Sequence, residues 1–161
     1  MKLSLALPLL LALSSGSQAQ TVESIEAILA SVRAEYAQNC KTVEFGEGFA
    51  EPVKIDSDRL DDLLVDYHEL LCDGSTQTFC GAAGCDMILY IQNEDRTYRE
   101  LTAFFGYGVD FDQPHAQPPS FVVALHGNEC GRSGVEPCSI RYKIEGDGVV
   151  EVGEVSDAEA E

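Results

Sequence analysis

The run Met87-Ile88-Leu89-Tyr90-Ile91 is followed by the polar cluster Asn93-Glu94-Asp95-Arg96 and then by a largely apolar stretch from residue 98 to residue 105. Short apolar runs on both sides of a polar turn are typical of a β-hairpin. We therefore expect two neighbouring antiparallel strands here, and the rest of the predicted fold is built around them.

Further short strands are predicted along the chain, at residues 53–55, 63–71, 121–125, 140–144 and 149–155. The last two alternate around Gly146-Asp147-Gly148, which indicates a second hairpin. Residues 106–119 are rich in Gly, Pro and Asp and lack periodicity, so they are predicted to form a long surface loop.

One amphipathic helix is predicted ahead of the strands. Apolar residues recur at three- and four-residue steps from Val22 to Tyr36, with Thr21 as the expected N-cap and Asn39 as the expected stop. The predicted fold class is therefore α+β: an N-terminal helix packed on a mostly antiparallel β-sheet of about six short strands, stabilised by disulfides.

The chain of 161 residues begins with the features of an export signal. Lys2 precedes an apolar run at residues 3–13, and Ser17-Gln18-Ala19 fits the small-x-small cleavage rule. The run is too short to cross about 30 Å of hydrocarbon as a helix, so no membrane insertion is expected. The predicted organisation is a signal peptide at 1–19, a single α+β domain at 20–155 and an acidic tail at 156–161. The expected location is periplasmic or secreted.

The charge of the chain limits the kinds of partner. It holds 10 Lys and Arg against 28 Asp and Glu, a formal net charge of −18, and loss of Lys2 with the signal makes the remainder more acidic. Nucleic-acid binding depends on cationic neutralisation of phosphates, so this composition argues against it. It also argues against docking on an anionic membrane surface. A cationic partner is favoured.

Six cysteines lie in the predicted mature chain, and an even number in an exported protein indicates disulfides. The small, turn-prone loops between them favour the pairs Cys80–Cys85 and Cys130–Cys138, which leaves Cys40 to pair with Cys72. The main alternative joins Cys72 to Cys80. Zinc and redox chemistry are disfavoured because the chain has no C-x-x-C motif and no histidine at a ligand spacing from a cysteine pair.

The densest acidic stretch lies at residues 55–66. Carboxylates at alternate positions of a turn can converge on one hard cation, so Asp56, Asp58 and Asp62 are candidate calcium ligands. The loop pattern is incomplete, because Lys54 and Arg59 stand where it needs a ligand and a glycine. The alternative is a solvated acidic turn, and no cofactor is expected overall.

Residues 53–66 resemble the D-x-D/N-x-D-G-x-x-D turn and following strand of FG-GAP/VCBS-type extracellular modules. With the motifs CDGS (72–75), FCGAAGC (79–85) and LHGNECG (125–131), the chain is similar to small uncharacterised secreted cysteine-rich proteins of alphaproteobacterial type. The resemblance spans roughly residues 40 to 145. It implies export, disulfides and a β-rich domain, and it implies no activity.

Two histidines are candidates for acid–base chemistry. His126 follows an apolar strand, from which its side chain can project into a cleft. His68 lies in a predicted strand whose alternation places Asp66 on the same face, and an Asp–His pair can orient a general base or share a metal. A nucleophile is missing, because the chain has no G-x-S-x-G motif and no free cysteine is expected. We therefore expect no enzyme.

Four aromatic residues before the predicted loop form a further candidate site: Phe104, Phe105, Tyr107 and Phe111. Such a patch can stack a sugar or hold a peptide. The alternative is that these side chains divide between core and surface at the end of a strand.

The favoured hypothesis is an exported, disulfide-stabilised acidic domain that binds a cationic or protein partner without catalysis. One version is an inhibitor that inserts the 130–138 loop into a basic hydrolase. The first alternative is a small periplasmic hydrolase that uses His126 or His68 with an Asp. The second is a calcium-stabilised structural or adhesive module.

Overall fold

The structure is a computed structural model, which describes residues 21–22, 24–111, 118–133 and 136–155. Strands make up 49% of these residues and helices 15%. The central sheet has the order β1-β8-β7-β4-β3, with β6 also paired to β7. Its strands are β1 Thr21–Val22, β3 Ala50–Val53, β4 Asp62–Asp66, β6 Cys80–Gly81, β7 Gly84–Gln92 and β8 Tyr98–Gly106.

Two further sheets and one α-helix complete the described part of the chain. The outer sheet has the order β12-β11-β10-β9, and the small sheet pairs β2 with β5. Their strands are β9 Gly108–Asp110, β10 Ser120–Leu125, β11 Cys138–Glu145, β12 Gly148–Glu154, β2 Val43–Phe45 and β5 Leu70–Cys72. The helices are α1 Ile25–Tyr36 and the 3-10 turns η1 Tyr67–Glu69 and η2 Gly127–Cys130.

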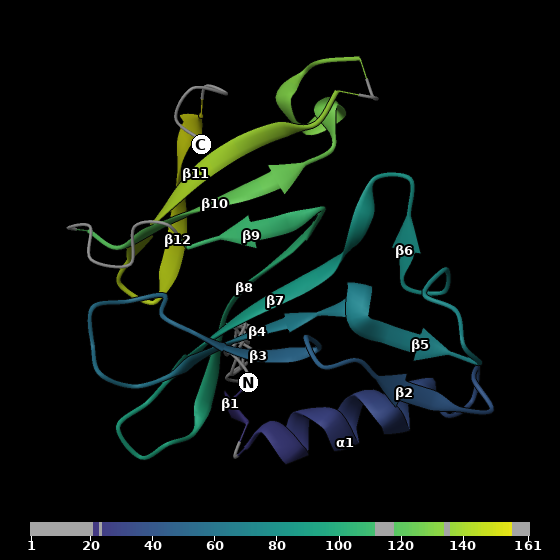
Figure 1. Ribbon diagram of the computed structural model, residues 1–161. Helices are drawn as coiled ribbons and strands as arrows, with labels where there is room; N and C mark the ends of the chain where they lie inside the picture. Colours follow the sequence, from purple (N-terminus) through teal and green to yellow (C-terminus); the bar gives the residue numbers. More distant parts are fainter. Residues whose placement is uncertain (1–20, 23, 112–117, 134–135, 156–161) are drawn as a thin grey trace, which may run out of the picture.

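The fold is therefore mostly β, and the prediction of a helix packed on a single sheet is wrong. Figure 1 shows α1 at the bottom, the central sheet above it and the outer sheet at the top. The strands predicted at residues 121–125, 140–144 and 149–155 belong to the outer sheet, which packs on the face of the central sheet opposite α1. Apolar periodicity reports that a strand is buried, but it does not report which sheet the strand joins.

Burial on both faces explains the apolar runs of the central strands. On β7, Met87 and Leu89 face the outer sheet, whereas Ile88 and Tyr90 face α1. Leu63, Leu64 and Val65 of β4 divide between the same two clusters. An antiparallel strand with one face exposed to solvent would alternate apolar and polar residues, but both faces of these strands are covered.

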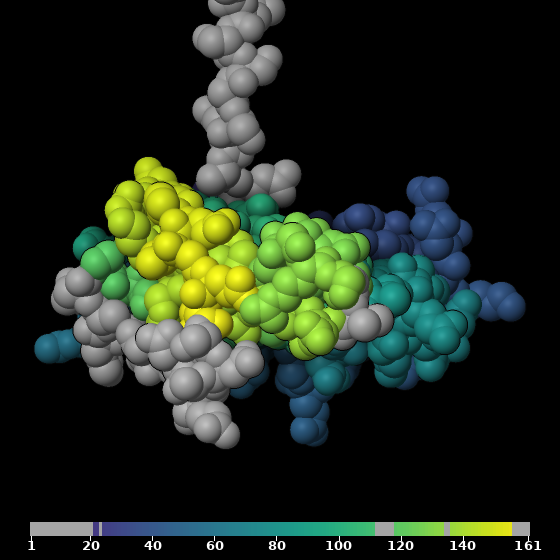
Figure 2. Space-filling view, turned by 90° about the horizontal axis from the view of Figure 1, so that it is seen from above, coloured from purple at the N-terminus to yellow at the C-terminus, as the bar shows by residue number. Residues whose placement is uncertain are grey.

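The chain passes from the central sheet to the outer sheet at a corner between β8 and β9. An added Cβ at Gly106 would lie 2.5 Å from the carbonyl oxygen of Ala124, so only glycine fits this close approach. The predicted loop at 106–119 therefore contains β9, which pairs with β10. In Figure 2, strands β10 to β12 (green to yellow) cover the middle of the face seen from above. Val150 and Val152 on the edge strand β12 are exposed.

The helix begins later than its apolar spacing predicts. Ser24 is the N-cap, and its Oγ accepts a hydrogen bond from the backbone N–H of Ala27 at 3.2 Å. Thr21, the expected cap, instead pairs with Arg99 in the short strand β1. Ile28 and Val32, one turn apart, are the buried residues of the helix.

Three disulfides join Cys40 to Cys72, Cys80 to Cys85 and Cys130 to Cys138, with Cα–Cα distances of 5.3, 4.2 and 6.4 Å. This is the pairing that the loops between the cysteines favour. The first bond ties the chain after α1 to β5, and it therefore connects the helix to the small sheet. Three disulfides in so small a chain indicate an oxidising, extracytoplasmic environment.

Within the described ranges, no helix combines the length and the apolar character that crossing a membrane requires. The predicted signal peptide at 1–19 and the predicted acidic tail at 156–161 lie outside the described residues.

Candidate functional site

The acidic turn between β3 and β4 uses its carboxylates to hold its own backbone. Asp62 is fully buried, and its carboxylate accepts hydrogen bonds from the backbone N–H groups of Ile55 and Gln92, each at 3.0 Å, and of Asp56 at 3.3 Å. Asp56 accepts from the N–H of Asp58 at 2.8 Å. The three carboxylates do not converge on one point, because each is directed at N–H groups.

The ammonium group of Lys54, and not a metal ion, supplies the positive charge of this turn. Lys54 Nζ donates to the carbonyl oxygen of Arg59 at 3.0 Å and to that of Leu60, and it lies 3.0 Å from a carboxylate oxygen of Asp61. Carbonyl and carboxylate oxygens are the ligands that calcium would need. Across the described residues, no group of three or more His, Cys, Asp or Glu side chains has the arrangement of a metal site.

Burial raises the pKa of Asp62 above its ordinary value, because desolvation opposes the charged form more strongly than the three N–H donors favour it. The pKa of Asp56 is also raised, first by burial and then by the neighbouring Asp58 carboxylate. The turn is thus a small polar core whose polar groups are satisfied internally.

The structure brings His68 and Asp66 together, although not by strand alternation. The predicted strand 63–71 ends at Asp66, which caps the 3-10 turn η1 by accepting the backbone N–H of His68 at 2.9 Å. The Nδ1 atom of His68 lies 2.6 Å from the same carboxylate oxygen. An ionised carboxylate only accepts, so Nδ1 of His68 is the donor in this contact.

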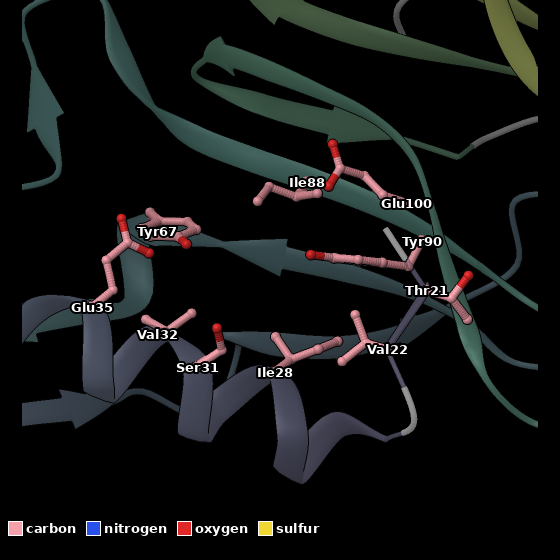
Figure 3. A pocket seen from close by; sticks show the side chains of 10 residues that line it. All are labelled: Thr21, Val22, Ile28, Ser31, Val32, Glu35, Tyr67, Ile88, Tyr90 and Glu100. Carbon is pink, nitrogen blue, oxygen red and sulfur yellow. The ribbon is translucent and has the colours of Figure 1, made fainter. Parts of the chain in front are cut away.

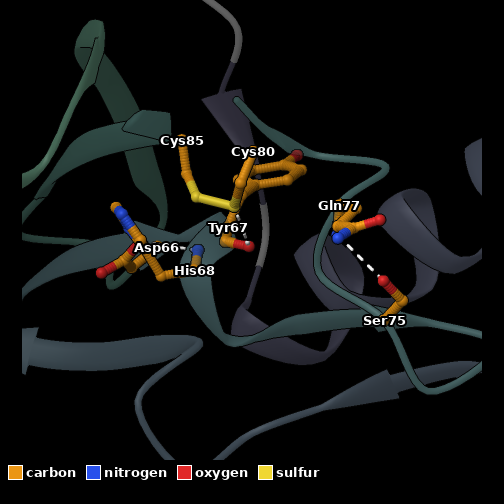
Figure 4. The surroundings of a disulfide bond; sticks show 7 residues. All are labelled: Asp66, Tyr67, His68, Ser75, Gln77, Cys80 and Cys85. Atoms are coloured by element: carbon orange, nitrogen blue, oxygen red, sulfur yellow. Dashed lines mark hydrogen bonds and ion pairs between the residues drawn. A yellow bond between two sulfur atoms is a disulfide. The ribbon is translucent and has the colours of Figure 1, made fainter. Parts of the chain in front are cut away.

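The Cys80–Cys85 disulfide lies beside this pair, as Figure 4 shows. The sulfur of Cys80 is 3.7 Å from the carbonyl oxygen of Tyr67 in η1. Both cysteines are consumed in the disulfide, so neither supplies a thiol nucleophile to His68.

His126 belongs to a different part of the molecule. It caps η2 in the outer sheet, where its Nδ1 accepts the backbone N–H of Asn128 at 3.4 Å. Its ring centroid lies 6.5 Å from that of Tyr107, and it lines a hollow of about 270 Å³ together with Phe105 and Glu129. A histidine that caps a turn through Nδ1 has a structural role, which its position in the sequence does not reveal.

The aromatic residues before the predicted loop divide between core and surface. Phe104 and Phe111 pack against the buried residues between the two large sheets. Phe105 and Tyr107 are 45% and 41% exposed, and the hydroxyl of Tyr107 donates to the carbonyl oxygen of Ala82 at 2.9 Å. The four residues therefore do not form one continuous patch.

A recess lies between α1 and the central sheet, and we call it the α1 cavity (Figure 3). It has a volume of about 400 Å³. Its apolar walls come from Val22 of β1, Ile28 and Val32 of α1 and Ile88 of β7. Pockets of this size accept small ligands or single side chains.

The polar groups of the α1 cavity are two tyrosine hydroxyls and two carboxylates. Tyr67 comes from η1 and Tyr90 from β7, and their hydroxyls point toward the middle of the cavity in Figure 3. Glu35 comes from the last turn of α1 and Glu100 from β8, so the carboxylates stand on opposite walls. Ser31 adds a hydroxyl at the exposed mouth.

The two tyrosines are largely buried as residues, but their hydroxyl oxygens are not sealed from solvent. Tyr67 is 6% exposed and Tyr90 is 7% exposed. Within the part of the chain that the structure describes, neither hydroxyl has a hydrogen-bond partner. A hydroxyl that opens into a cavity can be hydrated there, so it costs little free energy while it has no partner in the chain. These hydroxyls are therefore available to a ligand.

The cavity also has a negative electrostatic field. Burial, and after it the charge of Glu100, raises the pKa of Tyr90 to about 12. Burial also raises the pKa of Tyr67, to which Tyr36 and Glu35 add. Among the residues that are described as lining the cavity, none is Lys, Arg or His. A group with a positive charge fits this field.

Sequence analysis did not find this cavity, because its ten lining residues come from positions 21 to 100 and from several elements. Tyr67 and Tyr90 lie in segments that the sequence predicts as strands, with no role predicted for their hydroxyls. The tyrosines themselves were a signal in the sequence. A strand that needs only apolar surface can use Phe, whereas the hydroxyl of a Tyr in such a strand needs water or a hydrogen-bond partner.

Comparisons with known proteins do not add a relationship: no family model, no curated protein and no solved structure matches the chain.

Proposed function

We propose that this chain is an exported, non-catalytic binding protein, periplasmic or secreted, whose partner is cationic. The observation that carries the proposal is the α1 cavity, in which two tyrosine hydroxyls have no hydrogen-bond partner among the described residues and two carboxylates come from opposite walls. The formal net charge of −18 supports it, because long-range attraction speeds the encounter with a positive partner. The disulfides that fix α1 and the loops keep the binding surface rigid before the partner arrives, which lowers the entropy cost of binding.

The test is a binding measurement with the oxidised chain from residue 20 onward. Its affinity for a lysine- and arginine-rich peptide is compared with that for a peptide of the same length in which the cations are replaced by glutamates. We expect only the basic peptide to bind, and its affinity to fall as salt rises from about 0.1 M to about 1 M, because the Debye length shrinks from about 10 Å to about 3 Å. The proposal is overturned if the two peptides bind equally well or if neither peptide binds.

Two matched variants localise the binding. Glu100→Gln removes one carboxylate from the α1 cavity, and Glu151→Gln makes the same charge change on the exposed strand β12. The proposal requires that Glu100→Gln weakens binding more than Glu151→Gln. A loss that is the same for both variants would assign the attraction to net charge alone.

The inhibitor version of this function uses the loop closed by the Cys130–Cys138 disulfide, in which Arg132 forms an ion pair with Glu154 of β12. It stays a prediction of the sequence. An assay of lysozyme activity with and without the purified chain tests it directly, and an unchanged rate at saturating chain would remove it.

A second function, hydrolysis with His68 as general base, is favoured by the 2.6 Å contact between its Nδ1 and the Asp66 carboxylate. The nucleophile would have to be water or a group of the substrate, because Cys80 and Cys85 are bonded to each other. Esterase, glycosidase, phosphatase and peptidase substrates test it. An activity that is lost in His68→Ala and kept in His126→Ala, with unchanged melting temperatures, would support it.

A further inference from the structure

We infer that the α1 cavity receives the side chain of a lysine, with its ammonium group between the tyrosine hydroxyls and the carboxylates and its aliphatic stem against the apolar walls. This inference rests on the proposed function, since it specifies which cationic group of the partner is bound. It follows from the composition of the cavity, the directions from which its acceptors come, and the unmet hydrogen-bonding capacity of its tyrosines.

The walls match a cation that has an apolar stem. Ile28 and Val32 on α1 face Ile88 on β7 across the cavity, as Figure 3 shows. A metal ion or a bare ammonium would leave this apolar surface in contact with water. A lysine side chain instead lays its methylene groups on such surface and carries its charge at the tip. The burial of these methylenes adds a favourable hydrophobic contribution.

The acceptors favour an ammonium over a guanidinium. Glu35 on α1 and Glu100 on β8 stand on opposite walls, and the hydroxyls of Tyr67 and Tyr90 come from η1 and β7. Groups that approach from several directions suit the three donors of an ammonium, which can be turned about its stem. The planar fork of arginine pairs best with one carboxylate in its own plane.

The same ligand would satisfy the tyrosines. An ammonium has donors and no acceptor, so each hydroxyl oxygen can accept one of its hydrogens. Tyr67 lies in the field of Glu35 and Tyr90 in that of Glu100, so each hydroxyl is the neutral neighbour of one carboxylate. Hydrogen bonds that involve a charged group are stronger than neutral ones. The bound cation would therefore meet two neutral acceptors and two charges.

The test uses two peptides that differ only in their cations, which are all lysine in one and all arginine in the other, and n-butylammonium as a probe of the side chain alone. We expect the lysine peptide to bind about tenfold more tightly than the arginine peptide. We expect n-butylammonium to compete with it, whereas n-butanol, which has the same stem and no charge, does not.

Two variants locate the ammonium. Tyr90→Phe removes one acceptor and keeps the ring, and Glu100→Gln removes one charge and keeps the shape. We expect each to weaken the lysine peptide about tenfold, with a melting temperature close to that of the parent. Glu151→Gln on β12 is the control and should leave the lysine-to-arginine ratio unchanged.

The outcomes separate the two proposals. If both peptides bind equally in a salt-dependent manner and Tyr90→Phe has no effect, the lysine assignment fails and cationic binding stands. If n-butylammonium binds and loses affinity in Tyr90→Phe but neither peptide binds, the cavity takes a free amine and the protein-partner function fails. If nothing binds, both proposals are overturned.

Discussion

The acidic turn before β4 and the α1 cavity both gather carboxylates, but they differ in what their polar groups contact. In the turn, Asp62 and Asp56 accept hydrogen bonds from backbone N–H groups, and Lys54 donates to the carbonyl groups. In the cavity, the hydroxyls of Tyr67 and Tyr90 have no partner within the described part of the chain. The carboxylates of the turn are therefore hydrogen-bonded within the turn, whereas the tyrosine hydroxyls of the cavity are open to a ligand.

This difference shows that the number of acidic residues is a weak guide to a binding site. A carboxylate that holds the backbone contributes to folding, and a substitution there should cost stability. A hydroxyl without a partner contributes little to stability at neutral pH and is free to serve binding. The two regions should thus respond in opposite ways to mutation, pH and added ligands.

The largest effect is expected from Asp62→Ala in the turn. The change leaves the buried N–H groups of Ile55, Asp56 and Gln92 without their acceptor, so we expect a loss of about 3 kcal/mol in the free energy of unfolding. Urea denaturation of the oxidised chain measures it.

Asp58→Ala is the matched control, because this exposed carboxylate accepts the N–H of Leu60 at 2.7 Å instead of holding several buried N–H groups. Its loss should be below about 1 kcal/mol. Similar losses for Asp62→Ala and Asp58→Ala would mean that the turn has no internal polar core, and the comparison with the cavity would lose its basis.

A smaller effect is expected when the tyrosines are ionised. The pKa of Tyr90 is about 12 in the folded chain against 10.0 for the free side chain, because burial opposes the phenolate. Between these values the native state binds more protons than the unfolded state, so stability must fall as pH rises from about 10. The buried Tyr67, whose pKa is also raised, acts in the same direction.

Tyr90→Phe isolates this contribution. At neutral pH the variant should be about as stable as the parent, since the hydroxyl makes no hydrogen bond within the described residues. By pH 11 it should lose about 1 kcal/mol less than the parent. Urea unfolding from about pH 9 to about pH 11 checks this. A variant that is strongly destabilised at neutral pH would show that the hydroxyl has a partner inside the fold.

The parts of the fold that sequence analysis found are those with local causes. The cluster at residues 93–96 and Gly146-Asp147-Gly148 carry their own turn chemistry, and both hairpins are present in the structure. Two of the disulfides close short loops, and the third joins the two cysteines that remain. The division into two stacked sheets depends on contacts between distant residues, such as the corner at Gly106, and no local pattern encodes it.

The break in the predicted strand 63–71 is caused by a side-chain hydrogen bond to the backbone. Its composition is compatible with a continuous strand, but the Asp66 carboxylate accepts the backbone N–H of His68 and turns the chain into η1. Asp can offer the backbone this alternative to a strand ladder. The turn also places Tyr67 at the wall of the cavity, so the misjudged break and the missed site have one cause.

The smallest effect is expected from calcium. The melting temperature should differ by less than about 1 °C between millimolar calcium and chelator. A ligand stabilises a protein only by binding to its native state, and the turn offers calcium no free site. Calcium would have to displace the ammonium of Lys54 from the carbonyls of Arg59 and Leu60 and from Asp61. The variant Lys54→Met removes that ammonium and provides the control. A calcium response in the parent that is no larger in Lys54→Met would contradict a turn that is already complete.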